Sequence, residues 1–150
     1  MSFLQRIVRA AGRRPGRVLA VVAVLVAIGT ALSLVYAKAA AGEPVEVFAC
    51  ETRPLLQGAR LTAWELQRLG VPFTVIADGA AGSLMARGRV DAVILGADRI
   101  CANGDVINKV GSYAHALGAH RAGLPFVVVA PESTVDLQTP DGAAVEIEDR

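Results

Sequence analysis

The chain has 150 residues, carries a formal net charge of +1 and contains two cysteines. This length suits one domain with a sizeable core, and the near-neutral charge leaves no basic face for nucleic acid. Cys50 and Cys101 lack the spacing of a zinc site, and His115 and His120 lie five positions apart, so we expect surface histidines and no metal.

The amino-terminal segment combines a basic start with a long uncharged run. Residues 1–17 contain arginines and no acid, and the uncharged run spans Val18–Ala37. A run of about 20 apolar residues suffices to cross a bilayer, so one interpretation is a membrane anchor. Gly29-Thr30 interrupts the run, and only a short Ala/Gly segment separates it from the next apolar stretch. These features favour a buried helix of a cytoplasmic domain, and we do not expect a membrane as a partner.

From Val45 onwards, predicted strands and helices alternate. Apolar runs predict strands over Val45–Cys50, Val71–Ala77, Asp91–Gly96 and Phe126–Ala130. Helices are predicted over Leu56–Leu69, over Ala80–Ala86 and from Asp105 towards His120, with Pro54 suiting the start of the first and Asp105 the N-cap of the last. Such alternation is typical of right-handed βαβ units. We therefore predict an α/β fold, a parallel sheet with helices on both faces, preceded by an apolar helix.

Polar side chains follow each predicted strand where the strand ends. They are Glu51 with Arg53, Asp78, Asp98 with Arg99, and Ser133 with Thr134. Ligands of open α/β sheets bind at this edge. Two carboxylates that approach each other in a partly dry crevice leave one protonated near neutral pH, which suits a general acid. Asp98 is our candidate for that acid, and the alternative is that it solvates a loop.

Three further residues are candidates for substrate binding at the same edge. Gln57, one turn into the helix after Pro54, is placed to hydrogen-bond a sugar hydroxyl. Asn108 and Lys109 fall in the first turn of the helix predicted from Asp105, where free backbone N–H groups favour an anion. No glycine-rich phosphate loop accompanies the strand-end acids, which argues against a magnesium nucleotide site. The alternative for all three is a solvated surface side chain.

Three motifs resemble the signatures of the S-methyl-5-thioribose-1-phosphate isomerase family of methionine salvage. They are Glu51–Leu66, Gly96–Ile100 and Asn103–Tyr113, and the resemblance runs from about residue 28 to residue 150. It implies a Rossmann-like catalytic domain over residues 28–150 behind an atypical segment, 1–27. Ribose-1,5-bisphosphate isomerase and the regulatory subunits of translation initiation factor 2B share this domain, but Leu55–Trp64 is more typical of the thioribose enzyme.

The resemblance implies an aldose-to-ketose isomerisation without a cofactor. Its substrate is a small sugar phosphate, S-methyl-5-thio-α-D-ribose 1-phosphate, and its product is S-methyl-5-thio-D-ribulose 1-phosphate. The anomeric phosphate blocks spontaneous ring opening, so an acid must protonate the ring oxygen while hydrogen moves from C2 to C1. By analogy Asp98 is that acid, and Gln57, Asn108 and Lys109 contact the substrate. The resemblance also implies a homodimer when the chain is complete.

The sequence departs from the family in three places. The family pairs its acid with a cysteine in a Cys-Asn-x-Gly loop, which falls at about Val18, where this sequence has no cysteine. From the resemblance we also expect this chain to lack the family's upstream domain, with its Arg-Gly-Ala segment, and the family's carboxyl-terminal segment. We therefore expect little isomerase activity from the chain as written. The alternatives are a non-catalytic subunit that senses a sugar phosphate or a nucleotide, and a membrane-anchored derivative of the domain.

Overall fold

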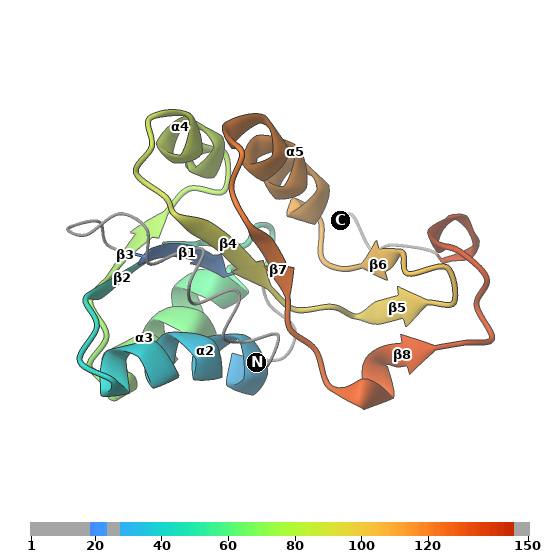
Figure 1. The fold of residues 1–150 in the computed structure, drawn as a ribbon, viewed down its shortest axis with the longest axis horizontal. Helices are drawn as coiled ribbons and strands as arrows, with labels where there is room; N and C mark the ends of the chain where they lie inside the picture. The colour runs from blue at the N-terminus through green and yellow to red at the C-terminus, as the bar shows by residue number, and fades with distance from the viewer. Residues whose placement is uncertain (1–18, 24–27, 146–150) are drawn as a thin grey trace.

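A large parallel sheet runs through the computed structural model, which describes residues 19–23 and 28–145 (Figure 1). Its order is β3-β2-β1-β4-β7, and every neighbouring pair is parallel. The strands are β1 (Leu19–Ala23), β2 (Val45–Cys50), β3 (Phe73–Ile76), β4 (Ala92–Leu95) and β7 (Phe126–Val128). The predicted α/β class and parallel sheet are confirmed.

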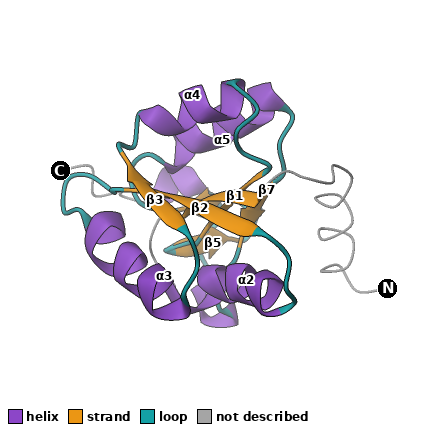
Figure 2. Cartoon of the chain, turned by 90° about the vertical axis from the view of Figure 1, so that its left-hand side faces the viewer, coloured by secondary structure: helices purple, strands orange, loops and turns teal. Residues whose placement is uncertain are grey.

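Helices cover both faces of this sheet (Figure 2). On one face lie α2 (Ile28–Ala40) and α3 (Ala63–Leu69), and on the other α4 (Ala80–Ala86) and α5 (Ser112–Ala122). Alternate residues of β4 enter two separate hydrophobic clusters, Ile94 with Leu66 of α3 and Leu95 with Met85 of α4. Burial on both faces explains why the sequence of β4, Ala92–Leu95, is continuously apolar.

The uncharged amino-terminal run forms two elements rather than one helix. The apolar helix is confirmed from Ile28, but Leu19–Ala23 forms β1, which pairs with β2 and β4 in the middle of the sheet. The prediction of a helix over Leu19–Ala23 was wrong. In a short apolar run, hydrophobic periodicity does not distinguish a buried strand from a buried helix. Val18 lies outside the described residues. Within those residues, no helix has the length and apolar character that a membrane crossing requires.

Two predicted helices begin later than their sequence signals indicated. Pro54 lies in a turn, and a short π-helix over Gly58–Thr62 leads into α3. Asp105 is not a helix N-cap, because β5 (Arg99–Cys101) and β6 (Val106–Ile107) form an antiparallel hairpin around it. The Asn-Gly-Asp turn signal serves a hairpin as well as a helix start, and α5 begins only at Ser112.

The polar stretch after β7 belongs to a second, smaller sheet that the sequence did not predict. Its order is β6-β5-β8, and β8 (Val135–Asp136) runs parallel to β5. The chain then returns to the hairpin, where the carboxylate of Asp105 accepts a hydrogen bond from the backbone of Gly142 at 3.0 Å. This small sheet extends the carboxyl-end edge of β4, where the candidate acid lies.

Candidate functional site

Asp98 follows β4 as predicted, and its backbone is tied to the small sheet. The N–H of Asp98 donates to the carbonyl of Ile107 at 2.8 Å. Partial desolvation raises the pKa of the Asp98 carboxyl above its ordinary value of 3.8, while the charge of Lys109 lowers it. Asp98 is exposed to solvent, so the desolvation is incomplete. A raised pKa was expected, but its cause is the protein surroundings and not a second carboxylate.

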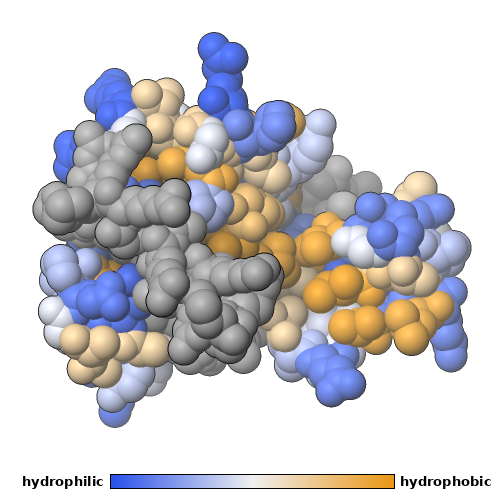
Figure 3. Space-filling model, in the orientation of Figure 1, coloured by the Kyte–Doolittle hydropathy of each residue, from blue (hydrophilic) through white to orange (hydrophobic). Residues whose placement is uncertain are grey.

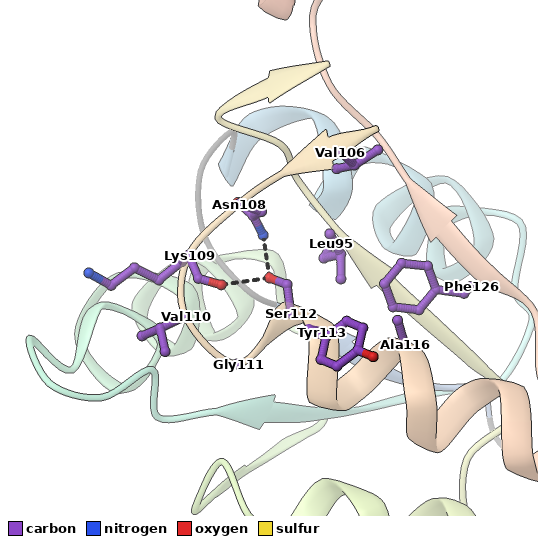
Figure 4. Close-up of a pocket in the computed structure, with 10 residues that line it drawn as sticks. All are labelled: Leu95, Val106, Asn108, Lys109, Val110, Gly111, Ser112, Tyr113, Ala116 and Phe126. Carbon is purple, nitrogen blue, oxygen red and sulfur yellow. Dashed lines mark hydrogen bonds between the residues drawn. The ribbon is translucent and has the colours of Figure 1, made fainter. Parts of the chain in front are cut away.

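Asn108 and Lys109 lie in a loop between β6 and α5, not in the first turn of a helix. Asn108 is 5% exposed, and its Nδ2 donates to Ser112 Oγ at 2.9 Å. Ser112 Oγ in turn donates to the carbonyl of Lys109 at 2.8 Å (Figure 4). The Oδ1 of Asn108 is buried and has no hydrogen-bond partner in the described part of the chain. The prediction that these two residues lie in the first turn of a helix is therefore wrong, because α5 begins only at Ser112. Among the described residues, the loop presents the charge of Lys109 and an unpaired acceptor on Asn108.

A cavity of about 490 Å³ opens beside this loop (Figure 4). Asn108 and Lys109 lie in its lining, whereas Asp98 and Gln57 do not. Its other walls are mainly apolar and come from Leu95, Val106, Val110, Gly111, Ser112, Tyr113, Ala116 and Phe126. The structure thus brings two of the four predicted residues into one cavity and links Asp98 to them through Ile107.

Gln57 lies just before the π-helix, in the loop that leaves β2. Its Oε1 is buried and, among the described residues, has no hydrogen-bond partner. Asp78 shapes this loop, because its carboxylate accepts hydrogen bonds from the backbone N–H groups of Thr52 and Arg53 at 2.8 and 2.7 Å. Asp78, one of the strand-end acids, therefore stabilises a turn.

Gly58, the first residue of the π-helix, lies very close to β2. An added Cβ at this position would be 1.8 Å from the carbonyl oxygen of Cys50.

Arg99, another strand-end residue, braces the small sheet. Its Nη1 donates to Asp136 Oδ2 and to Thr139 Oγ1, both at 3.0 Å. Hydrogen bonds from Thr139 and from the backbone N–H of Gln138 lower the pKa of Asp136, and the Arg99 charge lowers it further. The ion pair of Arg99 and Asp136 thus has a structural role: it holds β8 beside the hairpin that leads to Asn108.

His115 is the residue that the sequence interpretation misplaced. It was expected on a helix surface, but it is 4% exposed and contacts two other elements. Its Nδ1 lies 2.6 Å from the carbonyl oxygen of Gly111, and its Nε2 lies 3.3 Å from Cys50 Sγ. The available signal was its spacing of four from Ala119, the other buried residue of α5. His120 is exposed as expected. Across the described residues, no group of three His, Cys, Asp or Glu side chains is arranged to hold a metal ion.

Relatives with high sequence identity carry isomerase names. Methylthioribose-1-phosphate isomerase of Anaeromyxobacter dehalogenans is 62% identical over 122 residues, which cover 81% of this chain and 36% of the relative. The 5-deoxyribose 1-phosphate isomerase of Moorella thermoacetica is 57% identical over 122 residues, covering 81% and 35%. The chain spans about a third of the length of these relatives.

Solved structures agree with the sequence comparison. The 5-methylthioribose 1-phosphate isomerase of Pyrococcus horikoshii superimposes with a TM-score of 0.83 at 39% identity, covering 97% of this chain and 42% of that chain. Subunit delta of translation initiation factor eIF-2B from A. fulgidus gives 0.80 at 38% identity, covering 98% and 47%. The sequence also matches the Initiation factor 2 subunit family over residues 17–150. The resemblance carried by the three motifs is confirmed, and the chain belongs to the Initiation factor 2 subunit family.

Proposed function

We propose that this chain is part of an aldose-ketose isomerase that converts S-methyl-5-thio-α-D-ribose 1-phosphate to S-methyl-5-thio-D-ribulose 1-phosphate. One observation carries the proposal. Asp98, a carboxylic acid with a raised pKa, is hydrogen-bonded through its backbone to the residue before Asn108 and Lys109. Residues 28–150 form the catalytic domain in this proposal, and the complete protein is a cytoplasmic homodimer.

Each residue has a defined role in the reaction. Asp98 in its protonated form donates to the ring oxygen as the bond between that oxygen and C1 breaks. The C2 hydrogen moves to C1 as a hydride, and the C2 hydroxyl becomes the ketone as it releases its proton to water. The exposed Asp98 carboxylate then regains a proton from water, so the protons balance over one turnover. The Lys109 ammonium offsets the phosphate charge, and the unpaired Oδ1 of Asn108 accepts a hydrogen bond from a sugar hydroxyl. Gln57 Oε1, also unpaired, is available for a second hydroxyl.

The cavity supports a substrate whose 5-substituent is apolar. Phe126, Leu95 and Ala116 provide apolar walls, and Lys109 is the one cation among its lining residues. A second phosphate at C5, as in ribose 1,5-bisphosphate, would need another cationic partner. The methylthioribose and 5-deoxyribose phosphates in the names of the relatives above carry no second phosphate, so they need no second cationic partner.

A non-catalytic role is the second candidate, because subunit delta of eIF-2B is almost as similar in structure as the isomerase. Measuring isomerase turnover distinguishes the catalytic role from the non-catalytic one. Residues 29–150 of this chain, placed in Anaeromyxobacter dehalogenans methylthioribose-1-phosphate isomerase instead of its matching segment, should support isomerisation followed by ³¹P NMR. A rate within about tenfold of the parent enzyme, a difference of about 1.4 kcal/mol in the barrier, is expected. A folded chimera that binds the substrate without turnover would select the non-catalytic role.

A further inference from the structure

Cys50, His115 and Gly111 form a chain of contacts between β2 and the loop before α5. Cys50, the last residue of β2, is fully buried, and its Sγ lies 3.3 Å from Nε2 of His115. On the other side of the ring, Nδ1 lies 2.6 Å from the carbonyl oxygen of Gly111. The imidazole therefore bridges two segments that are far apart in the sequence.

The partners determine where the ring carries its hydrogen. A backbone carbonyl can only accept, so Nδ1 of His115 holds a hydrogen and donates it to Gly111. In the neutral ring, Nε2 then has a free lone pair, which can accept from the Cys50 thiol. Burial, together with the charges of Asp78 and Glu51, raises the pKa of that thiol to about 12, so it keeps its proton. The contacts assign one tautomer to His115.

The two ends of this chain lead to the candidate substrate contacts. Gly111 has a φ of +102° and closes the loop that begins at Asn108 and Lys109. Its carbonyl also accepts the backbone N–H of His115 at 3.1 Å. At the other end, the Cys50 carbonyl accepts from Thr52 Oγ1, at the start of the loop that reaches Gln57.

We propose that His115 is a positioning residue of the sugar-phosphate site, whose Nδ1–H holds the Gly111 carbonyl and so orders the loop that presents Asn108 and Lys109. The Cys50 thiol supports this role because it donates to Nε2 of His115 and so keeps the ring hydrogen on Nδ1. The inference rests on the proposed function of the same site. It differs from a role in core packing, because an apolar side chain of similar volume fills the space but donates nothing to Gly111.

Two substitutions separate positioning from packing. The side-chain amide nitrogen of His115→Asn occupies nearly the place of Nδ1 and can still donate to Gly111, whereas that of His115→Gln lies nearer to Nε2. For each purified 150-residue chain we would measure the affinity for S-methyl-5-thioribose 1-phosphate by calorimetry and the thermal unfolding midpoint. The expected loss of affinity is about 3- to 10-fold for His115→Gln, the effect of one hydrogen bond, and less than about twofold for His115→Asn. His120→Gln, an exposed change on the same helix, should alter neither value.

Each outcome decides the matter. Equal losses of affinity for Asn and Gln that follow their unfolding midpoints would show a packing role and overturn the inference. If the unaltered chain binds and His115→Gln binds equally well, the inference fails while the proposed function stands. If the unaltered 150-residue chain does not bind, the same variants are compared in the chimera described above, where equal affinity of His115→Gln and unaltered His115 would overturn the inference alone. An unaltered chimera that neither binds nor converts the substrate would overturn the proposed function, and with it this inference. Should His115→Gln not fold, the same comparison applies to Cys50→Ala, which loses the thiol donor, against Cys50→Ser, which keeps a donor and should retain affinity.

Discussion

The backbone N–H of Asp98 donates a hydrogen bond to the carbonyl of Ile107 at 2.8 Å. Asp98 leaves β4 of the large sheet, and Ile107 ends β6 of the small sheet, directly before Asn108. This bond therefore joins the candidate acid to the loop that carries the other candidate groups. Its position at the junction of the two sheets explains how the hairpin, which binds nothing itself in the proposed mechanism, places Lys109 within electrostatic range of the Asp98 carboxyl.

Asp98→Asn in the chimera should reduce turnover strongly. The amide has the shape of the carboxyl but cannot protonate the ring oxygen, and a positioned general acid contributes about 10²- to 10⁴-fold in rate. The matched control is Glu132→Gln, an exposed carboxyl in the short 3-10 helix after β7, which should leave turnover unchanged. Initial rates at saturating substrate test both. A fall of less than about tenfold in Asp98→Asn would argue against the assignment of Asp98 as the acid.

The stability of the chain should depend on pH through Asp98 in a defined direction. Because its folded-state pKa is raised from 3.8, ionisation is less favourable in the folded chain than in the unfolded chain. Relative to Asp98→Asn, the unaltered chain should lose stability as the pH rises from the ordinary carboxyl value through the raised pKa, and the difference should then stay constant. Urea unfolding of both chains across this range measures it. The effect should be small because Asp98 is exposed and solvent screens its charge. A difference that grows in favour of the unaltered chain with rising pH would contradict the shift.

Asn108→Ala should weaken ligand binding more than it weakens the fold. The substitution removes the hydrogen bond to Ser112, but it also removes a buried oxygen that has no described partner, so the free energy of unfolding should change by less than about 1.5 kcal/mol. Affinity for S-methyl-5-thioribose 1-phosphate should fall about tenfold, since a buried hydrogen bond to the ligand is lost. Asn103→Ala, on the exposed hairpin turn, is the control and should bind normally. Unchanged affinity in Asn108→Ala would remove Asn108 from the site.

Gly58→Ala should destabilise the chain by about 2–3 kcal/mol. A Cβ at this position would lie 1.8 Å from the carbonyl oxygen of Cys50 and 2.6 Å from Thr52 Oγ1, so the loop that carries Gln57 would have to move. Gly82→Ala is the contrasting variant, because nothing lies within 4 Å of its added Cβ in the middle of α4. It should raise stability by about 0.5–1 kcal/mol through the lower entropy of the unfolded chain. Similar unfolding midpoints in urea for the two variants would contradict this close contact.

The purified chain should self-associate. Hydrophobic residues gather over the small sheet (Figure 3), where Val106, Val135 and Leu137 are 40%, 43% and 76% exposed. Exposed apolar surface of this kind marks interaction sites in soluble proteins. Light scattering over a range of concentrations should show a mass above that of the monomer, and Leu137→Lys should reduce it. A monomer at high concentration would count against this expectation and against a homodimer that uses this surface.

The sequence by itself determined the class of the fold and the place of the acid. Mainly apolar runs bounded by Gly or polar residues predicted β2, β3, β4 and β7, because a strand that packs in the core leaves a local signature in its own sequence. The signature is strongest in β4, all of whose residues are buried. The same logic put Asp98 at the carboxyl end of β4, and the motif around it pointed to the family. The residue types needed for these conclusions lie within a few positions of one another.

Only the tertiary structure decided the elements that depend on pairing between distant segments. β1 pairs with β2 and β4, and β5 pairs with β8. The amino-acid pattern within each strand does not predict which other strand it pairs with. The Cys50 to His115 contact spans 65 positions, so a histidine that looks like a surface residue in its own helix is buried against another strand. Asn108 and Lys109 lie in a loop for the same reason: pairing of Ile100 with Val106 draws the residues after Asp105 into a hairpin, and this non-local gain outweighs the helix-start signal.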